Sequence, residues 1–440
     1  MAWYFRHAAE KVELNIQDRF HASQTMLHWI ASPPRARRRF NWVGDCMRPL
    51  NAVCAYVLFT FLSFTLVGIG IVLPAWVAFE AGGSPLVGWV LLASSLSGVV
   101  LAPLAGHLTD RGNRNRLAMV GQALRSLGMA VTAAAAVLPE IPAAVALVAA
   151  AVMGSFGFAV LSGSLSGILQ DLIPAERRTS FVLRLSVARQ VGIALGTGIA
   201  GLAIHQIGAS ATAISFAVIG SACIPLLRYV PATTIAPGTS AQQGLVAANL
   251  KAFRYLAEYP QCMIAAITVG MAYAVVQVTN LLLPGFVADS LHGGSALFGT
   301  LEMTAAIAGA VSVMVASTER IARLLQERTL AVLAAAGLAL VAFSFATADW
   351  GATIVYALAG ILWSLARALA NAYLLLVVDN AMMGRVQAFT TLITSACGGL
   401  IFLLPTLIPA ATEAGLYLGC GIAIIACASS LRIWNSRHSR

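Results

Sequence analysis

The sequence predicts an all-α membrane protein with twelve transmembrane helices in two six-helix halves and both termini in the cytoplasm. Three observations predict this: the composition, the number of long apolar segments, and the positions of Lys and Arg. Of the 440 residues, 59% are hydrophobic and 10% are charged, and the mean hydropathy is +0.83. Soluble globular chains carry about 45–50% apolar and about 25% charged residues. The composition therefore excludes an ordinary cytosolic enzyme, a disordered protein and a secreted disulfide scaffold.

Long apolar segments make up most of the chain. A bilayer core needs about 20 apolar residues for each helical crossing. Windows of this length predict twelve spans, at residues 52–75, 86–108, 117–138, 143–168, 181–204, 210–228, 262–287, 296–317, 329–347, 351–378, 387–408 and 414–433. The seven cysteines are too sparse for a disulfide framework and include no C-x-x-C pair, so we interpret them as small buried hydrophobic residues.

The positive charges divide the connecting segments into two classes. Of the 27 Lys and Arg residues, four lie inside spans (Arg125, Arg184, Arg189 and Arg367), and the others lie in the terminal segments or in loops of one face. The loops of the opposite face contain no Lys or Arg but carry carboxylates such as Glu80. The positive-inside rule therefore places both termini in the cytoplasm. The net charge of +10 reflects this topology rather than a nucleic-acid partner.

The segments outside the spans complete the predicted organisation. Residues 1–50 form a basic cytoplasmic extension without the apolar core of a signal peptide. Its arginine-rich run at 35–39 suits contact with anionic membrane lipids, or serves only to fix topology. Residues 51–229 form the N-terminal bundle, 230–260 a cytoplasmic linker, 261–433 the C-terminal bundle and 434–440 a tail. Within the linker, Leu245 to Tyr259 is predicted to be an amphipathic surface helix.

Two acidic and basic pairs recur at nearly the same spacing. Asp171 and Arg177 follow the fourth span, and Asp379 and Arg385 follow the tenth, 208 residues later. The segment 109–114 after the second span likewise matches the segment 318–323 after the eighth, at an offset of 209. The two matches indicate related six-helix halves that repeat in the same orientation.

The loop after the second span carries a recognisable motif. Its sequence, Gly106-His107-Leu108-Thr109-Asp110-Arg111-Gly112-Asn113-Arg114, resembles the loop 2–3 signature of the major facilitator superfamily, G-x-L-x-D-R-x-G-R-[RK]. The matching residues are Gly106, Leu108, Asp110, Arg111 and Arg114. Asn113 stands where a glycine is usual, and Asn115 where a second basic residue is usual.

From about residue 50 to 433 the chain is similar to the exporter branch that includes the enterobactin exporter and macrolide-efflux proteins. The segments 253–256 (FRYL) and 384–387 (GRVQ) and Arg189 carry this likeness. The resemblance implies a transporter in which loop charges form contacts that break and remake as the halves rock, although the loop could simply fix topology. Asp110 would lie near a helix N-terminus, and Arg111 and Arg114 would pair with carboxylates such as Asp171. The predicted gating residues are Gly106, Asp110, Arg111, Arg114, Asp171, Arg177, Glu319, Arg320, Asp379 and Arg385.

Ionisable residues inside spans are costly and usually face a cavity or a partner. Arg189 and Arg367 lie near the middle of the fifth and tenth spans, which the resemblance places beside a central cavity. Glu302 is the one carboxylate clearly inside a predicted span. These three residues are the candidates for substrate binding or coupling, although Glu302 could instead pair with an arginine and stabilise helix packing. Arg184 lies near an interface, and Arg125 is expected to be structural because the resemblance places the third span peripherally.

The excess of intramembrane arginines favours an anionic small-molecule substrate. The sequence contains no G-x-x-x-x-G-K-[ST] motif, so we expect a proton gradient to drive transport, with Glu302 as the proton carrier and Asp110 as second candidate. The scattered histidines have no ligand spacing, and we expect no metal, no cofactor, no nucleic-acid partner, no enzymatic activity and a monomer.

The favoured hypothesis is proton-coupled efflux of an anionic or amphiphilic, siderophore-like molecule across the bacterial inner membrane. The alternatives are multidrug or macrolide efflux, import by the same fold, and a scaffold or sensor that does not transport.

Overall fold

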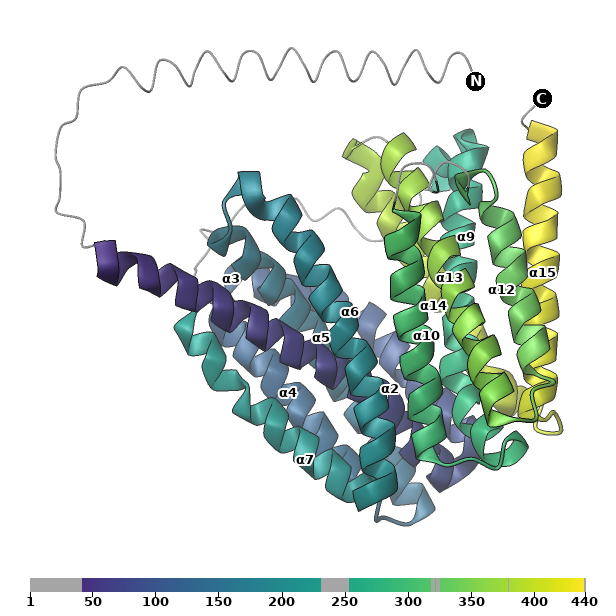
Figure 1. Cartoon of the computed structure of the whole chain (residues 1–440), viewed down its shortest axis with the longest axis horizontal. Helices are drawn as coiled ribbons and strands as arrows, with labels where there is room; N and C mark the ends of the chain where they lie inside the picture. The colour runs from purple at the N-terminus through teal and green to yellow at the C-terminus, as the bar shows by residue number, and fades with distance from the viewer. Residues whose placement is uncertain (1–41, 231–252, 318–320, 322–324, 379, 439–440) are drawn as a thin grey trace. The chain divides into compact units, whose positions relative to one another are not determined.

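A computed structural model describes residues 42–230, 253–317, 321, 325–378 and 380–438, nearly all of them helical (Figure 1). The chain divides into two units, Met1–Asn51 and Ala52–Arg440. The second unit contains all the described helices apart from the start of the first one. Residues 1–41 of the predicted basic extension lie outside the described residues, as do Glu319, Arg320 and Asp379.

The first helices of the second unit, here called the N-terminal helices, include one long helix with a break. They are α2 (Trp42–Val100, from Ala52 onward), α3 (Ala102–Arg111), α4 (Arg114–Ala135), α5 (Glu140–Leu172), α6 (Ala175–Ile207), α7 (Ala209–Ala222) and the 3₁₀ helix η1 (Ile224–Tyr229). Helix α2 is interrupted at Gly82 and Gly83, and Gly83 has φ +64°, which side chains other than glycine rarely adopt. The break falls between the first two predicted spans.

The helices after the linker, here called the C-terminal helices, follow the predicted spans closely. They are α9 (Pro260–Gly285) with the π-helical turn η2 (Phe286–Ser290), α10 (Ser295–Ala316), α12 (Thr329–Phe343), α13 (Asp349–Val377), α14 (Asn380–Leu407) and α15 (Glu413–His438). Residues 253–258, the end of the predicted surface helix, are also helical, and residues 245–252 of it lie outside the described residues.

Ten described helices are long and apolar enough to cross a membrane. One of them, Ala52–Val100, has 49 residues, about 73 Å at 1.5 Å per residue and more than twice the thickness of a hydrocarbon core. Helix α12 is apolar but has 15 residues. The prediction of a helical multi-pass membrane protein is thus confirmed, and the count of twelve stays a prediction.

The two sets of helices pack in the same pattern. Helix α4 packs against α5 and α7, and α12 packs in the same way against α13 and α15 (Figure 1). Counted along the predicted spans, α4 and α12 are each the third of a set, and their partners are the fourth and the sixth. The packing partners therefore repeat in the order that the sequence offset indicates.

One large apolar core joins the two sets, and its residues include Trp76 and Phe298, whose rings stack with centroids 6.0 Å apart. Two smaller cores each belong to one set. One contains Tyr56 and Leu165 from the N-terminal helices, and the other contains Leu256 and residues of α9, α13 and α14. The contacts between the sets therefore concentrate toward one end of the helices.

Polar and glycine contacts lie at the same end. The Ser84 hydroxyl donates a hydrogen bond to a Glu413 carboxylate oxygen at 2.8 Å. Helices α6 and α10 approach so closely at Gly201 and Gly299 that a Cβ on either residue would collide with the backbone of the other helix. Small residues allow such close packing between membrane helices.

Candidate transport site

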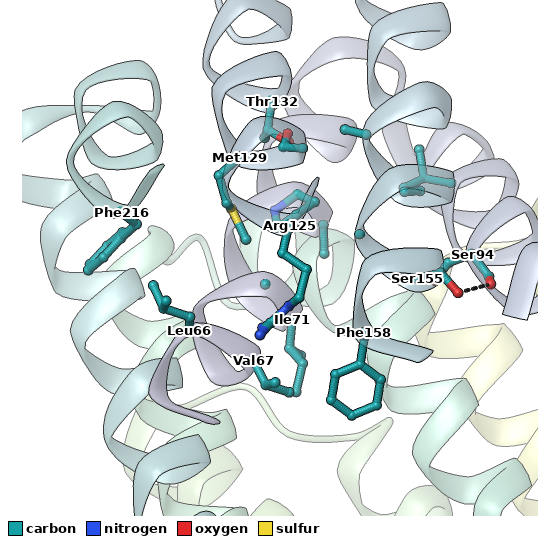
Figure 2. Close-up of a pocket in the computed structure, with 18 of the residues that line it drawn as sticks. Leu66, Val67, Ile71, Ser94, Arg125, Met129, Thr132, Ser155, Phe158 and Phe216 are labelled. Atoms are coloured by element: carbon teal, nitrogen blue, oxygen red, sulfur yellow. Dashed lines mark hydrogen bonds between the residues drawn. The ribbon is translucent and has the colours of Figure 1, made fainter. Parts of the chain in front are cut away.

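A cavity of about 330 Å³ lies among the N-terminal helices (Figure 2). Both segments of α2 line it together with α4, α5 and α7, and Asn280 is contributed by α9. Most lining side chains are apolar, and a small polar set includes Gln122 and Ser155. The Ser155 hydroxyl donates to the carbonyl oxygen of Ser94 at 2.9 Å on the cavity wall.

Arg125 of α4 supplies the charge of this cavity. Its Nη1 donates to Ser63 Oγ at 2.8 Å and to Gln122 Oε1 at 3.2 Å, and its guanidinium carbon lies 5.7 Å from the ring centroid of Phe158. The lining residues include no Asp and no Glu. The sequence predicts a structural role for Arg125. Its hydrogen bonds agree with that role, but a structural role does not explain why the guanidinium lies in the cavity wall.

Arg189 of α6 lies against aromatic side chains of α2. Its guanidinium carbon is 4.9 Å from the ring centroid of Phe64, and the guanidinium lies beside the Tyr56 hydroxyl. That hydroxyl donates to the Leu165 carbonyl oxygen at 3.0 Å. The buried Nε of Arg189 has no hydrogen-bond partner among the described residues.

Arg367 of α13 has a similar environment in the C-terminal helices. Its guanidinium carbon lies 5.0 Å from the ring centroid of Tyr273 in α9. Within the described part of the chain, no ion pair joins Arg189 or Arg367 to a carboxylate, and no hydrogen bond connects either arginine with Glu302. Arg189 and Arg367 therefore each lie against an aromatic ring, and neither shares a polar network with Glu302.

The aromatic rings beside Arg189 and Arg367 lie at positions that the internal repeat relates. Phe64 and Tyr273 are 209 residues apart, and so are Phe158 and Arg367. In the N-terminal helices the Phe64 ring contacts the Phe158 ring edge-on, with centroids 6.2 Å apart, whereas the equivalent pair in the C-terminal helices is Tyr273 and Arg367. Sequence reasoning missed these rings: the offset of 209 relates Phe64 to Tyr273, but it does not show that either ring lies against an arginine.

Glu302 of α10 faces a cluster of aromatic side chains in the C-terminal helices. Its Oε1 accepts a hydrogen bond from the Tyr356 hydroxyl at 2.7 Å. Tyr356 is fully buried, and its ring packs against Phe343 with centroids 5.2 Å apart. The ring of Phe343 in turn contacts that of Tyr417 edge-on at 5.2 Å. The partner of the carboxylate is therefore a tyrosine hydroxyl.

An ion pair fixes the turn between α3 and α4 to the end of α5. Arg114 Nη1 lies 2.5 Å from Asp171 Oδ2 and donates to the Gly167 carbonyl oxygen at 2.9 Å. The pair that the loop signature predicts is thus present, and it lies within the N-terminal helices. Its role in gating stays a prediction.

Asn115, where the family signature usually has a basic residue, is buried. Its side-chain amide donates to the carbonyl oxygens of Leu227 at 2.9 Å and Val230 at 2.6 Å. The amide thereby caps the end of η1, which a charged side chain in the same buried position would do only at a cost in desolvation.

The other predicted gating residues are less informative. Gly106 is exposed in α3, which ends at Arg111 and contains Asp110. Arg177 is exposed near the start of α6, and Arg385 donates to the Met382 sulfur at 3.3 Å in α14. In the described ranges, no cluster of three or more His, Cys, Asp or Glu side chains could hold a metal ion.

Comparison with known protein families identifies the family of this chain. The family model described as Major Facilitator Superfamily matches residues 53–431, and the chain therefore belongs to this superfamily. No curated protein matches the sequence. Family and fold together define a multi-pass membrane transporter rather than an enzyme.

Solved structures of transporters share the fold. A bacterial homologue of the iron transporter ferroportin, in an inward-facing state, is 14% identical, with a TM-score of 0.70 over 87% of this chain and 98% of that one. The nucleoside transporter NupG is 15% identical, with a TM-score of 0.67 over 86% and 98%. A POT family transporter in complex with 5-aminolevulinic acid is 12% identical, with a TM-score of 0.66 over 88% and 96%. At these identities the likeness shows the fold alone.

Proposed function

We propose that the protein is a proton-coupled secondary transporter that exports an anionic, siderophore-like small molecule across the bacterial inner membrane by alternating access. The likeness of the sequence to the enterobactin-exporter branch supports export and this cargo class. The twelve crossings of the proposal are supported by ten long apolar helices, by the break of α2 at Gly82 and Gly83, and by the short apolar helix α12.

The observation that carries the proposal is the environment of Arg189 and Arg367. Each guanidinium lies on an aromatic ring, at 4.9 and 5.0 Å from the centroid, and neither has a carboxylate partner within the described residues. A positive charge at membrane depth is costly unless something compensates it. An anionic substrate that enters between the sets of helices supplies this compensation, and aromatic surfaces beside the charge suit an aromatic acid or catecholate.

Glu302 is the proposed proton carrier. A carboxyl group inside a transport protein can gain and lose a proton as its surroundings change between states. Its hydrogen bond from Tyr356 remains possible in both protonation states, because a hydroxyl can donate or accept. Asp110 remains the second candidate.

The distribution of contacts supports alternating access. The shared core, the Ser84–Glu413 hydrogen bond and the Gly201–Gly299 approach lie toward one end, while each set has its own core elsewhere. Under the proposed topology this closed end is the outer one, which an inward-facing state of the proposed transport cycle requires.

The test measures uptake of labelled 2,3-dihydroxybenzoate into everted membrane vesicles under an imposed proton gradient. We expect gradient-dependent uptake that Arg189→Gln and Arg367→Gln each reduce by about tenfold or more, because each removes a charge-assisted contact. Arg184→Gln is the matched control, since Arg184 is exposed on the same helix as Arg189.

Three outcomes contradict the proposal. Uptake of a cationic dye but not of the acid identifies multidrug efflux. Accumulation only in right-side-out vesicles identifies import. Absence of flux for every probe identifies a scaffold or sensor.

A further inference from the structure

We infer that the cavity around Arg125 is a second ligand site, which binds a compact organic monoanion with an apolar body, such as an aromatic carboxylate. This inference goes beyond the transport proposal, because the cavity lies among the N-terminal helices and its charged residue is neither Arg189 nor Arg367. Binding there is measurable in a protein that transports nothing.

The size and the lining define the apolar part of the ligand. A volume of about 330 Å³ lies within the range of small-molecule sites, which begins at about 300 Å³. Figure 2 shows Leu66, Val67, Ile71 and Met129 arranged around the Arg125 side chain. Apolar walls of this kind exclude strongly hydrated ligands and accept a flat hydrocarbon or aromatic body.

The charge of the cavity defines the head group. Arg125 contributes one full positive charge, and no lining residue contributes a negative one. Three of its contacts use Nη1, to the Ser63 hydroxyl, the Ser63 carbonyl oxygen and Gln122 Oε1, while Nη2 makes one contact of 3.4 Å to the Ser63 carbonyl oxygen. A guanidinium has five N–H donors, so donors remain for a carboxylate, which it binds in a charge-assisted pair.

The surroundings hold the guanidinium in place before a ligand arrives. Ser63 and Gln122 fix Nη1, and the Phe158 ring lies beneath the charge at 5.7 Å. The Phe158 ring also provides an edge or face for an aromatic ligand. A fixed cation beside an open apolar volume therefore selects a ligand in which an anionic group is joined directly to an apolar body.

The same chemistry occurs in an anionic lipid. Helices α2, α4, α5 and α7 surround the cavity only in part, but its volume of about 330 Å³ suits a compact solute better than a lipid with two acyl chains. The experiment has an arm that separates these two sources.

The test is isothermal titration calorimetry of the full-length protein in an uncharged detergent with 2-naphthoate and with the uncharged 2-naphthamide. We expect wild-type protein to bind naphthoate about tenfold or more tightly than naphthamide, because the carboxylate gains a charge-assisted contact. We expect Arg125→Gln to remove this preference and Arg125→Lys to retain part of it.

A second variant keeps the test independent of Arg125, whose hydrogen bonds also tie α4 to α2. Gly154 lines the cavity, and a Cβ there meets no atom within 4 Å, so Gly154→Leu fills the space without touching the charge. We expect it to weaken naphthoate binding by about tenfold or more, since the ligand loses its volume. Gly419→Leu is the matched control, because a Cβ there also meets nothing and Gly419 lies outside the cavity.

Four results overturn the inference. Equal binding of acid and amide excludes the charged contact. Full naphthoate binding by the folded Gly154→Leu protein excludes this cavity, and loss of naphthoate binding in Arg189→Gln assigns the ligand to the proposed transport site instead. In nanodiscs, competition by phosphatidylglycerol against a phosphatidylcholine reference assigns the cavity to a lipid. Unchanged affinity in both lipids supports the solute.

Discussion

The N-terminal and C-terminal helices pack alike but differ in the charges they carry inside. The N-terminal helices hold Arg125 and Arg189, and the cavity beside Arg125 has no acidic lining residue. The C-terminal helices hold Arg367 and also Glu302, which accepts a hydrogen bond from the buried Tyr356. Among the charges inside the predicted spans, the N-terminal set thus has arginines alone, whereas the C-terminal set combines an arginine with an acid. Under the proposed function, both sets contribute an arginine to anion binding, and Glu302 of the C-terminal set exchanges the proton.

The largest expected effect comes from neutralising the acid. Glu302→Gln keeps the shape of the side chain and an acceptor for Tyr356, but it removes the group that exchanges a proton. We expect proton-driven uptake into everted vesicles to fall to background while the protein still folds. Glu327→Gln is the control, because Glu327 is exposed at the turn before α12. Unchanged uptake by Glu302→Gln would show that the C-terminal set does not carry the proton.

The second effect tests whether the two sets move relative to one another. Even a Cβ at position 201 would collide with Ser295 and Gly299. The larger side chain of Gly201→Leu is therefore expected to force the closed end apart. Overpacking of this kind costs about 1–3 kcal/mol, and we expect transport to fall by roughly tenfold.

Cross-linking of Ser84→Cys to Glu413→Cys by a short bifunctional thiol reagent, in a chain without the native cysteines, reports the closed end, because Ser84 Oγ and Glu413 Oε1 are 2.8 Å apart and a cysteine at 413 is shorter than the glutamate. We expect Gly201→Leu to reduce cross-linking and Gly419→Leu to leave it unchanged. Equal cross-linking in both variants would mean that α6 and α10 tolerate the wedge without opening.

Much of the fold could be predicted because a run of about 20 apolar residues is itself the signal for a membrane helix. The described helices begin at Glu140, Ser295, Asp349 and Glu413, each within a few residues of a predicted span. The charges at 189, 302 and 367 could be selected as candidates for the same reason, since a charge stands out in an apolar run. The roles assigned to them remain proposals.

The surroundings of those charges could not be predicted. Phe64, Tyr273 and Tyr356 are aromatic residues among many apolar ones, so nothing local distinguishes them before the helices pack. The cavity at Arg125 arises where segments from several helices meet, a property of tertiary packing. Asn115 was visible only as a departure from a motif, and its hydrogen bonds to Leu227 and Val230 depend on where η1 ends.

The smallest expected effect compares the two sets of helices at Phe64 and Tyr273, the positions that the internal repeat relates. Phe64→Leu and Tyr273→Leu each remove a ring from beneath a guanidinium, at 4.9 and 5.0 Å. Both rings are partly exposed, and a cation–π contact at an exposed site contributes about 0.5–1 kcal/mol, so we expect the apparent affinity for 2,3-dihydroxybenzoate to weaken by roughly two- to fivefold in each variant. Concentration-dependent uptake measures the effect, and Phe345→Leu, at an exposed position, is the control. If both sets contact the anion, the two losses are similar and the double variant loses about their product. A loss confined to Phe64→Leu would instead place anion binding in the N-terminal helices alone and leave Arg367 with a structural role.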